Sequence, residues 1–101
     1  MMLQTTPQEF LRKVNYVTKR DGTTESYDEN KISLAVSKAM KTVGMRSRLL
    51  PGEVANDVTN LLNEDDAADV QVGVDNIHTT VENVIMDMGL HDLAREYIRF
   101  R

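Results

Sequence analysis

The sequence predicts an α+β fold in which about four helices pack with a small three-stranded sheet, made of an N-terminal β-hairpin lid and one further strand. Four segments carry apolar residues at helical spacing, and three short segments carry β-favouring residues. The chain has 101 residues, of which 41% are hydrophobic, and this size suits one domain with one modest core. We expect a leader at residues 1–13 and a single folded domain at residues 14–101.

The first predicted element is a β-hairpin that begins at Val14. Its strands are separated by Asp21 and Gly22, and this pair favours a tight turn because glycine adopts a positive φ without steric cost. Asp28 follows the second strand and suits a helix N-cap, because its carboxylate can accept a hydrogen bond from a free backbone N–H group. The stretch from Val14 to Ile32 therefore predicts a strand, a turn, a second strand and a first helical turn.

Three cations lie near this predicted helix start. Lys31 follows the cap by about three residues, where a positive charge opposes the helix dipole at a cost of roughly 0.3–1 kcal/mol. Lys19 and Arg20 lie on the neighbouring strand and could point to the same place. Cations beside unpaired N–H groups favour an anion site, and phosphate is the usual anion. The alternative interpretation is that these side chains are only solvated.

Two predicted helices, joined by a basic connector at residues 45–50, follow the hairpin. The first ends at Gly44, which suits the left-handed position after a helix. The second begins at Pro51, whose missing N–H group costs nothing in a first turn. The residues predicted to face the core are Ile32, Ala35, Val36, Ala39, Met40 and Val43 in the first helix and Val54, Val58, Leu61 and Leu62 in the second.

The second half of the chain begins with an acidic segment, residues 63–69, which lacks the loop glycine and terminal glutamate of an EF-hand. A solvated loop is the better interpretation. Residues 70–74 alternate between apolar and polar and predict the third strand. Asp75 is expected to cap a third helix, which ends at Gly89, and a fourth helix follows. Their predicted inward residues are Ile77, Val81, Val84, Ile85 and Met88, then Leu90, Leu93, Ala94, Tyr97 and Ile98.

Composition excludes several classes of protein. The chain has no cysteine, which excludes disulfides, thiolate zinc sites and a cysteine nucleophile and fits a reducing cytoplasm. No apolar run approaches the ~20 residues of a membrane span, and no signal peptide is found. There are 12 Lys+Arg against 16 Asp+Glu, a net charge of -4, whereas nucleic-acid-binding proteins usually show the opposite balance. We expect neither a membrane nor a nucleic acid as partner.

No pattern for catalysis is present. No serine lies in a G-x-S-x-G motif, and the sequence contains neither a P-loop nor a dinucleotide-binding motif. Neither His78 nor His91 pairs with a nucleophile in a recognisable motif. His78 lies one turn into the third helix, where it would form a wall of the anion site or, equally, be a partly buried histidine with a backbone partner. We expect that the chain is not an enzyme by itself.

Both ends of the predicted domain carry a recognisable series of residues. The opening series is Val17-x-Lys19-Arg20-Asp21-Gly22, then Glu25, Tyr27, Asp28, Lys31-Ile32 and Ala35. The closing series is Val72-x-Val74-x-x-Ile77-x-x-x-Val81-Glu82, a helix ending at Gly89, and Ala94-x-x-Tyr97-Ile98-x-x-Arg101. In this order and spacing the chain resembles the ATP-cone family from Asn15 to Arg101.

The resemblance implies a regulatory domain of ribonucleotide reductase that binds ATP or dATP, with Mg²⁺ held through the phosphates. Such a domain sets overall activity through nucleotide-dependent oligomeric assembly, and its partner would be the catalytic or the radical-generating subunit. By matching positions, Lys19 would meet the phosphates, Lys31 the ribose-phosphate side, and Asp28 the adenine amine. The implied nucleotide-binding residues are Val17, Lys19, Arg20, Glu25, Ser26, Tyr27, Asp28, Glu29, Asn30, Lys31, Ile32, Val74, Ile77, His78 and Arg101.

Two departures from the family pattern concern the phosphates. Some members have a hydroxyl residue where this chain has Val74, and some have a lysine just after the position of Arg101. We therefore expect a lower phosphate affinity than in a complete domain, unless Arg101 substitutes for that lysine.

Two other functions stay open at this point. Transcriptional repressors of reductase genes also contain such a cone, but they add a cysteine-rich zinc ribbon, and this chain has no cysteine. The other alternative is a protein-interaction domain whose basic hairpin is only surface.

Overall fold

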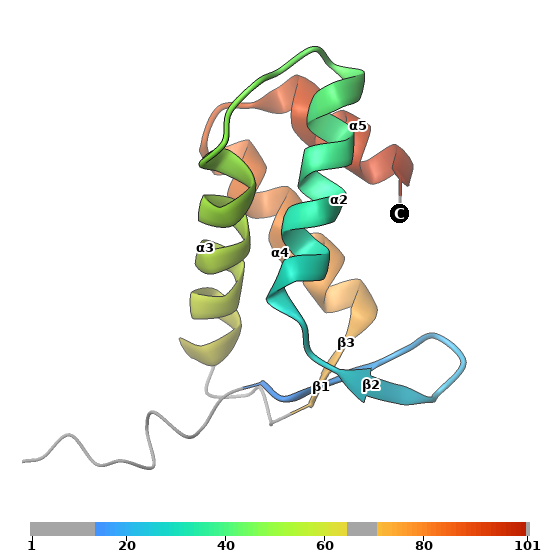
Figure 1. The fold of residues 1–101 in the computed structure, drawn as a ribbon. Coiled ribbons are helices and arrows are strands. Elements are labelled where there is room, and N and C mark those ends of the chain that lie inside the picture. Colours follow the sequence, from blue (N-terminus) through green and yellow to red (C-terminus); the bar gives the residue numbers. More distant parts are fainter. Residues whose placement is uncertain (1–13, 65–70, 101) are drawn as a thin grey trace, which may run out of the picture.

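A computed structural model of the chain describes residues 14–64 and 71–100, and in these residues a three-stranded sheet lies at one end of a group of four helices (Figure 1). The strands are β1 (Tyr16–Thr18), β2 (Thr24–Ser26) and β3 (Gln71–Gly73). The helices are α2 (Glu29–Thr42), α3 (Leu50–Glu64), α4 (Val74–Asp87) and α5 (His91–Phe100). The α+β architecture predicted from the sequence is confirmed.

β1 is the central strand of the sheet. It pairs antiparallel with β2, where Val17 lies opposite Glu25, and parallel with β3. In the turn between β1 and β2, Gly22 has a φ of 89°, a left-handed conformation that costs glycine little. The Asp21 carboxylate accepts hydrogen bonds from the backbone N–H and the hydroxyl of Thr23 at 3.0 and 2.6 Å. The predicted Asp-Gly turn is therefore present and held by its own side chain.

α2 begins where the sequence predicts. Asp28 is the N-cap, and its carboxylate accepts a hydrogen bond from the backbone N–H of Asn30 at 3.0 Å. Lys31 therefore lies in the first turn, three residues after the cap. Gly44 follows α2 with a φ of 74° and Gly89 follows α4 with a φ of 79°, as predicted for residues just beyond helix C-terminal ends.

α4 begins two residues earlier than predicted. β3 ends at Gly73 and the helix starts at Val74, whereas the sequence pattern extended the strand through Val74 and made Asp75 the cap. Gly73 takes the cap position with an extended backbone and no side-chain hydrogen bond. Asp75 lies instead in the first turn, where a carboxylate is favoured by the helix dipole, and it accepts a hydrogen bond from Arg20.

The entry to β1 is tied to the end of α3. The backbone N–H of Val14 donates to Asn63 Oδ1 at 3.0 Å. β1 begins at Tyr16, two residues after the predicted start at Val14. The predicted leader, most of the predicted acidic loop and Arg101 lie outside the described residues.

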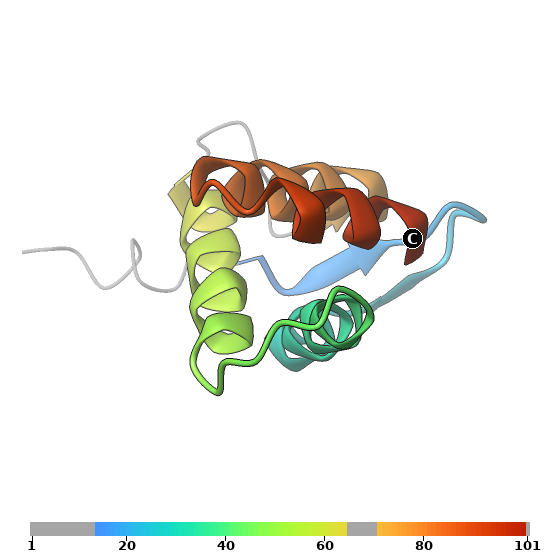
Figure 2. The same cartoon turned by 90° about the horizontal axis from the view of Figure 1, so that it is seen from above.

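The four helices form a ring in which α2 and α4 each pack on both α3 and α5. Seen from above, α2 lies on one side of β1 and the α4–α5 pair on the other (Figure 2). The buried centre consists of Val36, Val54, Val58, Val81, Ile85 and Leu93.

Two residues predicted to face the core point outward. Leu61 is 48% exposed and Ile98 is 46% exposed. Each is adjacent in sequence to a buried residue, Leu62 or Tyr97. Neighbouring positions on a helix diverge by about 100°, and this turn places Leu61 and Ile98 outside the buried face of their helices. Within residues 14–64 and 71–100, no helix combines the length and apolar character that crossing a membrane requires.

Candidate functional site

A cavity of about 170 Å³ opens between the hairpin and the helices. It lies where β2 leads into α2, opposite the first turns of α4 and one residue of α5. We call it the hairpin cavity. Its lining residues are Val17, Glu25, Ser26, Tyr27, Asp28, Lys31, Ile32, Ala35, Val74, Ile77, His78 and Tyr97.

Two tyrosines fix the inner walls of the hairpin cavity. The Tyr27 hydroxyl and Thr59 Oγ1 are hydrogen-bonded at 2.7 Å, which joins the end of the hairpin to α3. Burial raises the pKa of Tyr27 above its ordinary value, although the hydrogen bond with Thr59 opposes this effect. Across the cavity, the Tyr97 hydroxyl lies 3.0 Å from His78 Nδ1, and this bond orients the imidazole. Both tyrosine side chains in the cavity lining are therefore held in place by their hydroxyl groups.

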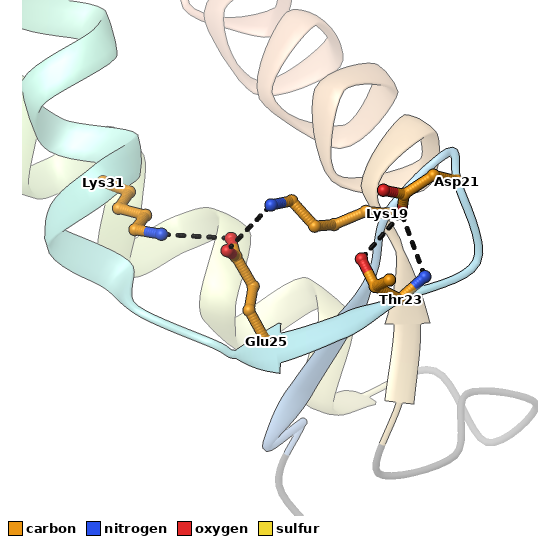
Figure 3. Close-up of polar contacts among 5 residues, drawn as sticks. All are labelled: Lys19, Asp21, Thr23, Glu25 and Lys31. Carbon is orange, nitrogen blue, oxygen red and sulfur yellow. Dashed lines mark hydrogen bonds and ion pairs between the residues drawn. The ribbon is translucent and has the colours of Figure 1, made fainter.

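Two ammonium groups meet at one carboxylate on the rim of this cavity (Figure 3). Lys31 Nζ lies 3.0 Å from Glu25 Oε2, and Lys19 Nζ lies 3.6 Å from Glu25 Oε1. The hydrogen bond from Lys31, followed by the charges of Lys31 and Lys19, holds the pKa of Glu25 below its ordinary value. The sequence predicted that three cations converge here: the structure brings Lys19 and Lys31 together at Glu25, but the expectation is wrong for Arg20.

Arg20 lies apart from this lysine pair. Its guanidinium donates to Asp75 Oδ1 from Nε at 3.1 Å and from Nη2 at 2.9 Å. Both side chains are more than half exposed. This contact ties the turn end of β1 to the first turn of α4, which forms the opposite wall of the hairpin cavity.

The other sequence-predicted residues divide into two groups. The predicted residues that line the cavity are Val17, Glu25, Ser26, Tyr27, Asp28, Lys31, Ile32, Val74, Ile77 and His78. The lining does not include Lys19 and Arg20, which follow β1, or Glu29 and Asn30, which lie in the first turn of α2. Arg101 is outside the described residues.

Two lining residues, Ala35 and Tyr97, were missing from the predicted site. Ala35 lies four residues after Lys31 on the same helix, so helical spacing could have identified it. Tyr97 was assigned to the core from its apolar periodicity, and nothing local in the sequence indicates that its hydroxyl meets His78.

The chemistry of this arrangement suits a flat aromatic ligand with an anionic tail. Pockets for whole drug-sized ligands usually measure about 300–1,000 Å³. The hairpin cavity, at about 170 Å³, has room for a single ring system, and an attached chain would lie at its rim. The rim holds two ammonium groups and the N-terminus of α2, and both favour an anion. In the described residues no group of three or more His, Asp or Glu side chains is arranged to hold a metal ion.

Comparisons with known proteins agree with the residue pattern. Residues 15–101 match the family model of the ATP cone domain. The chain is 35% identical over 85 residues to a vitamin B12-dependent ribonucleoside-diphosphate reductase of Mycobacterium tuberculosis, and the match covers 84% of this chain and 12% of that protein. It is 34% identical over 86 residues to an anaerobic ribonucleoside-triphosphate reductase of Salmonella typhimurium, with 85% of this chain and 12% of that protein covered. The chain therefore spans a small part of the length of these relatives.

Proposed function

The chain belongs to the ATP-cone family, and we propose that it is a nucleotide-binding regulatory domain of ribonucleotide reductase with ATP or dATP as its effector. The observation that carries this proposal is the meeting of Lys19 and Lys31 at Glu25, on the rim of a cavity with apolar and aromatic walls. The two reductases described above, both similar to this chain, support the choice of enzyme.

In this proposal the purine ring enters the hairpin cavity and the phosphates remain at its rim. Ile32, Ile77 and the two tyrosines would contact the base, and Asp28 would accept from its amine. Lys19 and Lys31 would exchange part of their contact with Glu25 for contact with phosphate oxygens. Mg²⁺ would be held by phosphate oxygens and water rather than by a protein cage, as is usual for this ion.

ATP and dATP differ by one ribose hydroxyl, and the regulatory step would follow from this difference. A ligand shifts a conformational equilibrium only by its differential affinity for the two states. The hydroxyl must therefore change a contact that reaches the outer surface of the helices. We propose that the readout is a change in assembly with the catalytic or radical-generating subunit.

Thermal unfolding with Mg²⁺ and either nucleotide tests this function. At about 100-fold excess over Kd, binding adds roughly 2.7 kcal/mol to the free energy of unfolding, which for a chain of this size predicts a rise in Tm on the order of 10 °C. Titration calorimetry with ATP and dATP would then give the stoichiometry and the preference.

Matched lysine variants connect this shift to the site. Lys19→Ala and Lys31→Ala should each remove most of the nucleotide-dependent shift while the Tm without nucleotide changes little, because both side chains are more than half exposed. Lys38→Ala, on the same helix as Lys31 and also exposed, should keep the full shift. Absence of any shift in the unmodified chain would favour the protein-interaction domain instead.

A further inference from the structure

A second concave surface lies between α3 and α4. It has a volume of about 370 Å³ and shares no residue with the hairpin cavity. We call it the acidic groove, and its lining residues are Asp57, Asn60, Leu61, Glu64, Val84, Asp87 and Met88. Within residues 14–64 and 71–100 no ion pair joins its three carboxylates to a cation. The groove thus combines uncompensated negative charge with an apolar floor.

The connector between α2 and α3, residues 43–49, has the opposite character. Arg46 and Arg48 are exposed, and neither forms an ion pair with another described residue. Leu49 is 73% exposed, more than the other large hydrophobic residues with appreciable exposure in the described part of the chain. The connector therefore exposes one large apolar side chain just after two arginines that have no ion-pair partner among the described residues.

The backbone of the connector is held at both ends. The N–H of Met45 donates to the carbonyl of Met40 at 2.9 Å, and the N–H of Leu50 donates to Ser47 Oγ at 3.1 Å. Figure 1 shows the connector as an outer loop between the ends of α2 and α3, and Figure 2 shows α2 and α4 on opposite sides of β1. The acidic groove contains no residue of the connector, so the two are separate surfaces of one molecule.

We propose that the connector of one copy docks into the acidic groove of a second copy. Leu49 would pack on Leu61 and Met88, while Arg46 and Arg48 would face the groove carboxylates. Charge complementarity selects this occupant, because the two arginines and the three groove carboxylates, none of which forms an ion pair with another described residue, lie on separate surfaces of the same chain. Each contact joins two different surfaces, so the interface is heterologous. When every copy forms the same contact with the next one, the copies assemble into a ring or an open chain.

This contact is separate from nucleotide binding. Neither surface contains a residue of the hairpin cavity, so self-association can be measured without nucleotide. If the docking proposal fails, the thermal-shift test of nucleotide binding is unaffected. If nucleotide binding fails, the test of self-association is equally unaffected.

Charge-reversal variants of the 101-residue chain test the docking directly. Sedimentation velocity at about 0.1 M salt should show concentration-dependent association that weakens at about 1 M salt, where the Debye length falls to ~3 Å. The double variant R46E/R48E carries an acidic connector, and D57K/D87K carries a basic groove. Each alone should raise the dissociation constant on the order of tenfold or more, because like charges would then face each other.

An equimolar mixture of the two variants should associate again, since each then presents a surface that matches the other. R95E/R99E, on α5, changes the net charge as much as R46E/R48E and should associate like the unmodified chain. Thermal melts would verify that all variants fold. The proposal is overturned if the unmodified chain stays monomeric, if either variant associates normally, or if the mixture remains monomeric.

Discussion

Glu25 is held between two lysines, and this position sets its titration. The pKa is lowered first by the hydrogen bond from Lys31 at 3.0 Å and less by Lys19 at 3.6 Å. We predict that Lys31→Ala raises the pKa of Glu25 toward its ordinary value of 4.5 and that Lys19→Ala raises it by less. Carboxyl chemical shifts followed by NMR through an acid titration would measure both, with Lys38→Ala as the unchanged control.

The sign of the linked effect on stability follows from this direction. A carboxyl with a lowered folded pKa contributes stability above its unfolded pKa, and the contribution disappears as the pH falls through the folded pKa. Glu25→Gln should therefore flatten part of the decline in Tm at acid pH and leave the slope near neutral pH unchanged. Equal pKa values for Glu25 in all three lysine variants would contradict the proposed hierarchy of contacts.

At the scale of single elements, the start of α2 depends on one cap. Asp28 accepts a hydrogen bond from the N–H of Asn30, and loss of such a cap costs about 1 kcal/mol. Asp28→Ala should reduce the free energy of unfolding by about that amount in urea denaturation. Asp28→Asn is the matched control, because asparagine caps about as well as aspartate. Equal losses in both variants would show that the carboxylate charge, rather than capping, is what matters.

Local chemistry explains why the sequence predicts these elements so directly. The Asp21-Gly22 turn and the Asp28 cap depend on residues two positions away or fewer, and apolar periodicity identifies the helices. The walls of the site depend on more distant pairs. Arg20 meets Asp75 across 55 positions. This pairing follows from the parallel alignment of β3 with β1, which brings the start of α4 near the end of β1 and which no local pattern specifies.

The start of α4 illustrates the same limit. Alternation extended β3 through Val74, and Asp75 resembled a cap, yet the helix takes Val74 as its first residue. The alternation and the aspartate are both present in the sequence, but the parallel pairing of β3 with β1 ends at Gly73, opposite Thr18. The position of Tyr97 in the cavity wall likewise depends on the packing of α5 against α4.

At the scale of the whole molecule, the hairpin cavity draws its walls from both halves of the chain. β1, β2 and α2 supply one side, and α4 and α5 supply the other. α3 contributes no lining residue and touches the site through the bond between Thr59 and Tyr27. A nucleotide in the cavity would therefore link the hairpin to α4 and α5 and leave the outer face of α3 free.

This asymmetry predicts a pattern of hydrogen exchange. With Mg²⁺ and ATP, amides that exchange through local opening should be protected in β2, in the first turn of α2 and in the first turn of α4. The second half of α3 should exchange at an unchanged rate at short labelling times, because its residues contact no part of the ligand. Amides that exchange only through global unfolding should exchange more slowly in every element, because binding raises the free energy of unfolding. Lys31→Ala provides the control without bound nucleotide, and local protection confined to α3 would contradict the assignment of the hairpin cavity as the nucleotide site.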